Sequence, residues 1–164
     1  MGSEMCIRDR LRVVFDASRK YGSDPTFNEC VAKGPDNFVN NLLSVCIGFR
    51  NGRVAAAGDL KKFHNQVRLV IEDVHMQRFF WRGMKTDQPP KVYAVTCNNF
   101  GVSSANCIAS SALYKSADLF ADKYPDASVA IKEQTYIDDE LPAAPTMEEL
   151  QVKTDRMDEI CLQV

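Results

Sequence analysis

The stretch Tyr136-Ile137-Asp138-Asp139 decides how this chain is interpreted. It continues a β-prone run that starts at Thr135 and it precedes Glu140-Leu141-Pro142, so it predicts the tip of a β-hairpin with two carboxylates at its turn. Adjacent side chains on an extended strand point to opposite faces, whereas a tight turn can bring both carboxylates to one side. A lone Asp-Asp pair is usually a solvated turn, and other acids are needed before it indicates chemistry.

A third acid, Asp59, ends the small apolar run Val54-Ala55-Ala56-Ala57-Gly58. An acid at a strand end and an acid pair on a hairpin are what two-metal phosphoryl transfer requires. Carboxylates hold two Mg²⁺ ions, which activate the attacking hydroxyl and stabilise the leaving oxygen. Asp59, Asp138 and Asp139 are therefore the candidate catalytic residues and metal ligands, and solvent-facing or capping acids are the alternative.

Five further stretches precede the acid pair: Arg12-Val13-Val14-Phe15-Asp16-Ala17-Ser18, Lys33-Gly34-Pro35-Asp36, Gly58-Asp59-Leu60-Lys61-Lys62-Phe63-His64-Asn65-Gln66-Val67, Arg78-Phe79-Phe80-Trp81-Arg82 and Phe100-Gly101-Val102-Ser103-Ser104. In this order, and with the Tyr-x-Asp-Asp box, the chain resembles the reverse transcriptase domain of long-terminal-repeat retrotransposons, closest to the Pao/BEL group. The resemblance covers about residues 11–150.

This resemblance implies an α/β (α+β) fold, the fingers–palm portion of a right-handed polymerase, with an antiparallel palm sheet packed on helices. It implies an RNA-directed DNA polymerase, a nucleotidyltransferase that uses two Mg²⁺ ions (or Mn²⁺) to join a dNTP to a primer 3′-hydroxyl. The partners would be an RNA template, a DNA primer and the remainder of a polyprotein. Two alternatives stay open: a catalytically inactive remnant of a retroelement polyprotein and an RNA-dependent RNA polymerase palm.

The resemblance also assigns roles to residues. Asp59 and Asp138 would be the principal metal ligands, with Asp139 less direct, and the main-chain carbonyl of Leu60 would be a further ligand. Tyr136 would lie near the primer terminus. The nucleotide-binding candidates are Arg12, whose guanidinium suits a triphosphate, and Leu60, His64, Phe100 and Gly101.

Two positions depart from the family pattern. His64 stands where relatives place the aromatic residue that packs under the sugar, so either His64 takes that role or the backbone brings Phe63 into place. Asn106 stands where relatives often have Pro. We expect Trp81 and Phe79 to pack in the core rather than to stack on bases.

Composition bounds the remaining expectations. The 164 residues suit one domain with a core, and the net charge of −2 combines a basic first hundred residues with an acidic remainder. The first ten residues fit no element, so residues 1–10 are predicted to be non-native or disordered. Residues 11–150 would be partial fingers and palm, and 146–164 a helix that stops before a thumb. The fragment alone is therefore expected to be inactive or a very poor polymerase.

The six cysteines are scattered without a Cys-x-x-Cys pair, and no secretory signal or long apolar run precedes them. We therefore expect an intracellular protein, cytoplasmic (in a virus-like particle) or nuclear, that is not secreted and contacts no membrane.

Hydrophobic spacing and turn residues predict the elements. Strands are expected over 11–15, 53–59, 78–81, 92–96 and 129–138, and helices over 35–51, 72–77 and 103–124, with a last helix opened by a capping box at Thr146. The 103–124 helix is expected to have one shared face of Ala105, Ala109, Leu113 and Phe120. The last helix is expected to face inward at Met147, Leu150, Met157 and Cys161.

Overall fold

The computed structural model describes residues 15–35 and 38–162. In these ranges the elements follow in the order α1 (Phe27–Cys30), α2 (Leu42–Asn51), β1 (Val54–Ala55), β2 (Gly58–Asp59), α3 (Phe63–Gln66), α4 (Ile71–Val74), β3 (Arg78–Trp81), β4 (Lys91–Ala94), α5 (Ala105–Leu119), α6 (Pro125–Glu133), β5 (Thr135–Tyr136), β6 (Asp139–Glu140), β7 (Ala143–Ala144) and α7 (Met147–Leu162). The chain is therefore mixed α and β, as the sequence predicts.

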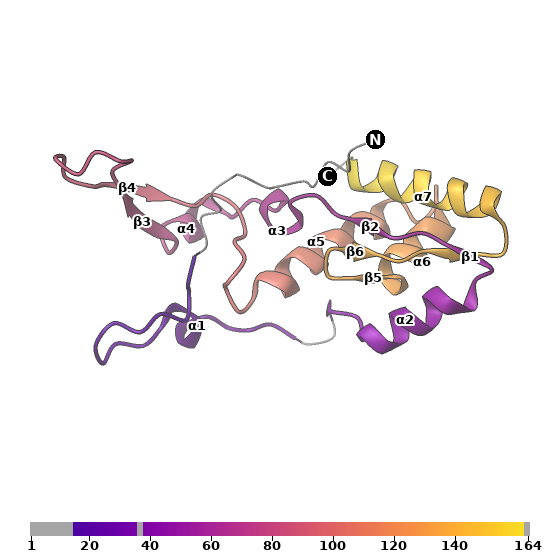
Figure 1. Ribbon diagram of the computed structural model, residues 1–164, viewed down its shortest axis with the longest axis horizontal. Coiled ribbons are helices and arrows are strands. Elements are labelled where there is room, and N and C mark those ends of the chain that lie inside the picture. Colours follow the sequence, from indigo (N-terminus) through magenta and orange to yellow (C-terminus); the bar gives the residue numbers. More distant parts are fainter. Residues whose placement is uncertain (1–14, 36–37, 163–164) are drawn as a thin grey trace, which may run out of the picture.

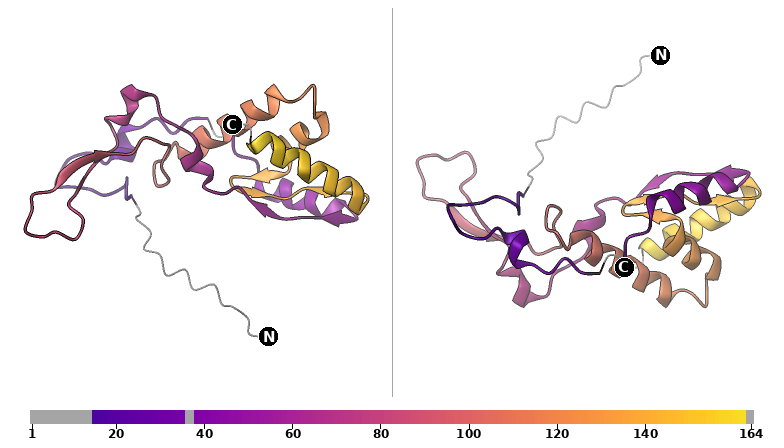
Figure 2. Two further views of the ribbon diagram at one scale, coloured as in Figure 1. Left: turned by 90° about the horizontal axis from the view of Figure 1, so that it is seen from above. Right: turned by 90° about the horizontal axis from the view of Figure 1, so that it is seen from below.

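The strands form small antiparallel sheets. One three-stranded sheet has the order β2-β6-β5, β1 pairs with β7, and β3 with β4 makes a separate hairpin. Figure 1 shows an elongated molecule, with the β3–β4 hairpin near one end and α2, α6 and α7 grouped around the other sheets. The views in Figure 2 show the same separation of the hairpin from α2, α6 and α7.

The main core lies between α5, α6 and α7. Small residues at the helix contacts allow close packing, and aromatic side chains close the edges. Its buried members are Ala117, Ala127, Ala130, Ile131, Met157 and Ile160. The predicted face of the 103–124 helix is confirmed, because Ala105 and Ala109 are buried and Leu113 and Phe120 pack at the core or its edge.

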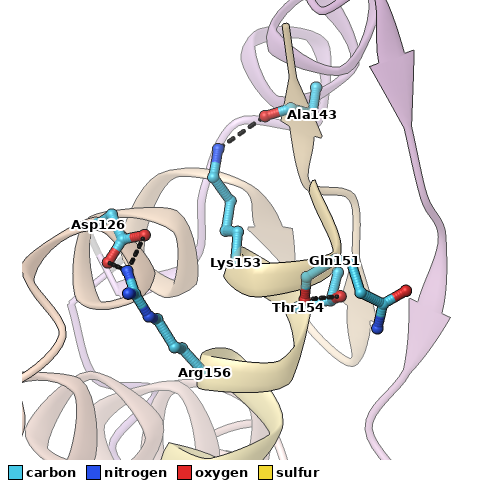
Figure 3. A network of polar contacts seen from close by, with 6 residues as sticks. All are labelled: Asp126, Ala143, Gln151, Lys153, Thr154 and Arg156. Atoms are coloured by element: carbon cyan, nitrogen blue, oxygen red, sulfur yellow. Dashed lines mark hydrogen bonds and ion pairs between the residues drawn. The ribbon is translucent and has the colours of Figure 1, made fainter. Parts of the chain in front are cut away.

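Helix α7 is tied to two neighbouring elements by polar contacts (Figure 3). Lys153 Nζ donates to the Ala143 carbonyl of β7 at 2.7 Å, and Arg156 contacts both carboxylate oxygens of Asp126 on α6 at 2.9 and 3.0 Å. The helix begins as predicted after Thr146, whose hydroxyl accepts from the Glu149 N–H at 3.2 Å. The Lys153 and Arg156 contacts therefore hold α7 against β7 and α6.

The strand predicted over 129–138 is wrong. Pro125 starts helix α6 instead, because its fixed φ suits the first helical turn. Ala127, Ala130 and Ile131 recur at helical spacing and are buried against the neighbouring helices. The extended segment is limited to β5, immediately before the acid pair.

Other predictions differ mainly in extent. The strand over 53–59 is two short strands, β1 and β2, and α2 begins at Leu42, with Asn41 accepting from the Ser44 N–H at 3.2 Å. The β3–β4 pair is confirmed, whereas Met147, expected to face inward, is 61% exposed. The strand predicted over 11–15 lies outside the described residues except for Phe15, and the first segment, 1–10, lies wholly outside them.

Asn40 links the start of α2 to the acidic hairpin. Its side-chain amide donates to the carbonyls of Lys132 and Thr135, both at 2.7 Å. These carbonyls belong to the end of α6 and the start of β5, where backbone acceptors lack helical partners. Asn40 therefore holds the entry of the hairpin in place.

Within residues 15–35 and 38–162, no helix combines the length and the apolarity that crossing a bilayer requires.

Candidate active site

The backbones of the three acids predicted from sequence come together at one end of the β2-β6-β5 sheet. Asp59 on β2 lies directly opposite Asp139 on β6, in antiparallel register. The Leu60 N–H, one residue further, donates to the Asp138 carbonyl at 2.8 Å. The backbone therefore brings Asp59 beside both members of the pair, although β2 and β6 are far apart in sequence.

The pleat of the sheet separates an outer row of side chains from an inner row. Asp59, Asp139 and Tyr136 are aligned across the three strands, and so are Gly58, Glu140 and Thr135. Side chains directly opposite each other point to the same face of the sheet, so the two rows point to opposite faces. Glu140 and Thr135 are buried, whereas Asp59 and Asp139 are exposed and Tyr136 is half-buried. The outer row is accessible to a ligand.

A two-residue turn, Ile137-Asp138, joins β5 to β6. Ile137 has φ of 56°, a left-handed conformation that is uncommon for a β-branched residue. Positive φ at the first central position matches the twist that tight hairpins need. The turn leaves Asp138 half-buried at the sheet edge beside Leu60.

The negative charges of Asp59 and Asp139 lie close together. Like charges directly opposite on neighbouring strands destabilise a sheet. Among the described residues, neither Asp59 nor Asp139 takes part in an ion pair. A bound cation would offset this repulsion.

The donor set suits magnesium more than a softer metal. No group of three or more His, Cys, Asp or Glu side chains within the described ranges lies close enough to hold a metal ion. Mg²⁺ commonly takes one or two protein carboxylates and completes its shell with water and substrate phosphates. The Asp59–Asp139 pair provides that number of carboxylates on one face. The Leu60 carbonyl already accepts from the Phe63 N–H at 3.0 Å, which occupies one of its two lone pairs.

Gly101 makes the loop before α5 possible. Its φ is +91°, and a Cβ there would lie 2.4 Å from the carbonyl oxygen of Phe15. Asn28 braces the loop, since its amide donates to the Gly101 carbonyl at 2.9 Å and its Oδ1 accepts from the Ser103 N–H at 2.8 Å. Phe100 is left 38% exposed beside this glycine.

The two departures from the family pattern contact one another. His64 Nε2 lies 2.7 Å from Asn106 Oδ1, which links α3 to the first turn of α5. Phe63 is buried and its ring meets the His64 ring edge-on, with centroids 5.2 Å apart. His64, in contrast, is half-buried. Arg12, the predicted triphosphate contact, lies outside the described residues.

Sequence reasoning missed Glu140, the buried acid behind the site. Its Oε1 accepts from the Cys161 thiol of α7 over 4.0 Å. Burial first, and the charge of Asp158 second, raise the pKa of the Glu140 carboxyl to about 7. Burial, with the charges of Glu140 and Asp158, raises the pKa of the Cys161 thiol to about 12, so the thiol keeps its proton. Period-two alternation after Asp139 was the available signal for an inward Glu140.

Asn28 and Asn40 were also missed, because side-chain bonds to distant carbonyls leave no periodic pattern in the sequence. No protein-family model matches the chain, and no curated protein matches it either.

Proposed function

We propose that this chain is the fingers–palm part of an RNA-directed DNA polymerase of the Pao/BEL retrotransposon type. It would join a dNTP to the 3′-hydroxyl of a DNA primer on an RNA template, inside the cell and as part of a larger polyprotein. The observation that carries the proposal is the register of Asp59 opposite Asp139, with Asp138 on the adjoining turn. The six ordered sequence stretches support it independently.

Each residue of the site would have a separate role. With metal bound, Asp138 would join the facing Asp59 and Asp139 to hold two Mg²⁺ ions, although the three side chains do not form a three-ligand group in the described structure. The ions would supply activation of the hydroxyl and stabilisation of the leaving oxygen. Tyr136 shares the outer row with Asp59 and Asp139, so a primer terminus at this face would contact its ring. The exposed lysines Lys61 and Lys62, which follow β2, offer positive charge for phosphates.

The sugar side of the site would differ from that of relatives. With Phe63 buried, an imidazole at His64 replaces a hydrocarbon ring, and Asn106 holds its Nε2. An imidazole both fills space and forms hydrogen bonds, so selection between dNTP and NTP is part of the test of function.

The experiment is single-nucleotide addition to oligo(dT) on poly(rA), with the 164-residue protein in excess over the primer. We expect Mg²⁺-dependent addition of dTMP that is lost in Asp59→Asn and Asp139→Asn and kept in Asp87→Asn, an exposed acid of the β3–β4 loop. Preferential addition of UMP would favour the RNA polymerase alternative.

A second measurement separates a remnant from an enzyme. Mn²⁺ broadens nearby amide signals in NMR spectra, and we expect broadening around residues 58–60 and 137–140 that Asp139→Asn weakens. A protein that adds no nucleotide and shows no such broadening would contradict the proposal.

A further inference from the structure

The β3–β4 hairpin exposes Trp81, which was expected in the core, whereas Phe79, expected there too, is half-buried. Phe79 pairs with Tyr93 and Trp81 pairs with Lys91, so these four side chains share one face of the hairpin. Trp81 is 45% exposed and Tyr93 is 46% exposed. We call this set (Phe79, Trp81, Lys91 and Tyr93) the aromatic face.

Ring contacts between neighbouring aromatic side chains fix the arrangement of the aromatic face. The Phe79 and Tyr93 rings stack with centroids 5.9 Å apart and an interplanar angle of 27°. Phe15 meets Phe79 edge-on, with centroids 5.2 Å apart. The half-buried Phe79 therefore supports Tyr93, and the outer part of the face, Tyr93 and Trp81, is left accessible.

The charge of the hairpin is opposite to that of the whole chain. Residues 78–94 contain four basic side chains, Arg78, Arg82, Lys85 and Lys91, and one acid, Asp87. All four basic side chains are exposed. Glu72 and Asp73 are on α4, outside the hairpin. A partner with regularly spaced negative charge would therefore be attracted to the hairpin.

Figure 1 and Figure 2 show the hairpin projecting from the end of the molecule away from α7. Its face is thus separate from the acidic edge of the β2-β6-β5 sheet.

We propose that the aromatic face binds single-stranded nucleic acid, with bases stacked on Trp81 and Tyr93 and phosphates paired with Lys91, Arg82 and Lys85. Aromatic side chains interleaved with basic ones are the recurring arrangement in proteins that bind single strands, because every base has a face to stack and every nucleotide a phosphate. A duplex keeps its bases stacked on each other and gains less from this surface. The proposal does not require the polymerase activity.

Trp81 is the one tryptophan of the chain, so its fluorescence reports directly on the aromatic face. We expect dT15 and rU15 to quench Trp81 emission in the 164-residue protein, and a 15-base-pair duplex to quench it much less. The dissociation constant should rise steeply with salt, and the Lys91→Gln variant should reduce the salt slope by about one. Comparison of dT15 with rU15 shows whether the sugar matters.

Variants are compared by fluorescence anisotropy of a labelled oligonucleotide. Trp81→Leu and Tyr93→Leu should each weaken binding at least about fivefold, the lower range for loss of one base–aromatic stack. Tyr21→Leu, a highly exposed aromatic outside the hairpin, and Phe80→Leu, on the opposite face, should leave binding unchanged. Lys91→Gln and Arg82→Gln keep the proposal testable if an aromatic variant does not fold.

Three results would overturn the proposal. The first is an unchanged affinity for the oligonucleotide in both Trp81→Leu and Tyr93→Leu. The second is oligonucleotide binding without any change in Trp81 emission. The third is Trp81 emission that shifts with protein concentration as the chain dimerises, since a second copy would then occupy the face.

Discussion

The Glu140 carboxylate lies 4.0 Å from the Cys161 Sγ, and this contact joins the inner face of β6 to helix α7 directly behind the acid pair. The buried Thr135 is aligned with Glu140 on the same face, and its hydroxyl has no hydrogen-bond partner among the described residues. A carboxyl in such a position is poorly solvated, which favours its neutral form.

The first prediction follows from this raised pKa. The folded protein holds a proton on Glu140 up to about pH 7, whereas an unfolded chain releases it near the ordinary pKa of 4.5. The free energy of unfolding should therefore fall as pH rises from about 4.5 to 7, by up to about 3 kcal/mol, and level off above pH 7. Urea unfolding across this range measures it.

The control for that titration is Glu140→Gln, which keeps the shape and removes the ionisation. The decline between pH 4.5 and 7 should be smaller in this variant, whereas Glu133→Gln, an exposed acid, should behave like the wild type. Parallel curves for wild type and Glu140→Gln would show that Glu140 does not titrate as described.

The second prediction concerns repulsion at the acidic edge. Asp139→Asn removes one of two like charges that face each other across β2 and β6. Without Mg²⁺, its free energy of unfolding should equal or exceed that of the wild type, by about 0.2–1 kcal/mol. Added Mg²⁺ should stabilise the wild type more than the variant, as thermal melts would show. Asp87→Asn is the matched control, and a large destabilisation by Asp139→Asn would instead mark a structural role.

The third prediction concerns Gly101. Alanine there would place a Cβ 2.4 Å from the Phe15 carbonyl oxygen at a φ of +91°, so Gly101→Ala should cost about 2 kcal/mol or more. Gly48→Ala is the control, because Gly48 is inside α2 with open space around a new Cβ. That change should stabilise by about 0.5–1 kcal/mol. Equal effects of the two substitutions in chemical denaturation would rule out the close approach to Phe15.

The fourth prediction concerns the proton on His64. Asn106 Oδ1 accepts hydrogen bonds, so the neutral His64 ring should carry its proton on Nε2, the atom 2.7 Å away. Imidazole ¹⁵N shifts in alkaline buffer distinguish the two tautomers. Asn106→Leu should produce a mixture at His64, while His75, the other histidine of the chain, is unaffected. A wild-type ring protonated on Nδ1 would contradict the contact.

Local patterns predicted much of the fold. The hairpin of β3 and β4, the helix after Thr146 and the position of Asp59 beside the acidic hairpin follow from alternation, capping and motif order. The failed strand at 129–138 shows the limit of this reasoning. Val129 and Ile131 are β-branched, but burial of Ile131 against the neighbouring helices outweighs their preference for strands.

The site was predictable where it depends on backbone pairing and unpredictable where single side chains decide it. The Asp59–Asp139 register follows from two strands that must pair. The His64–Asn106 bond depends on how α3 rests on α5, which no spacing in the sequence encodes. The exposure of Trp81 likewise depends on which elements cover the hairpin, not on the apolar character of its residues.

Strands β1 and β2 both pair with strands much later in the sequence, and this sets the order in which the protein can fold during synthesis. Their partners are β7 and β6, which the ribosome makes after three quite different segments: the hairpin, α5 and α6. Until Ala144 has left the ribosome, residues 54–59 form an unpaired edge that other chains could join. A nascent chain arrested before residue 135 should therefore contain a protected helix α5 while the amides of 54–59 exchange freely with solvent.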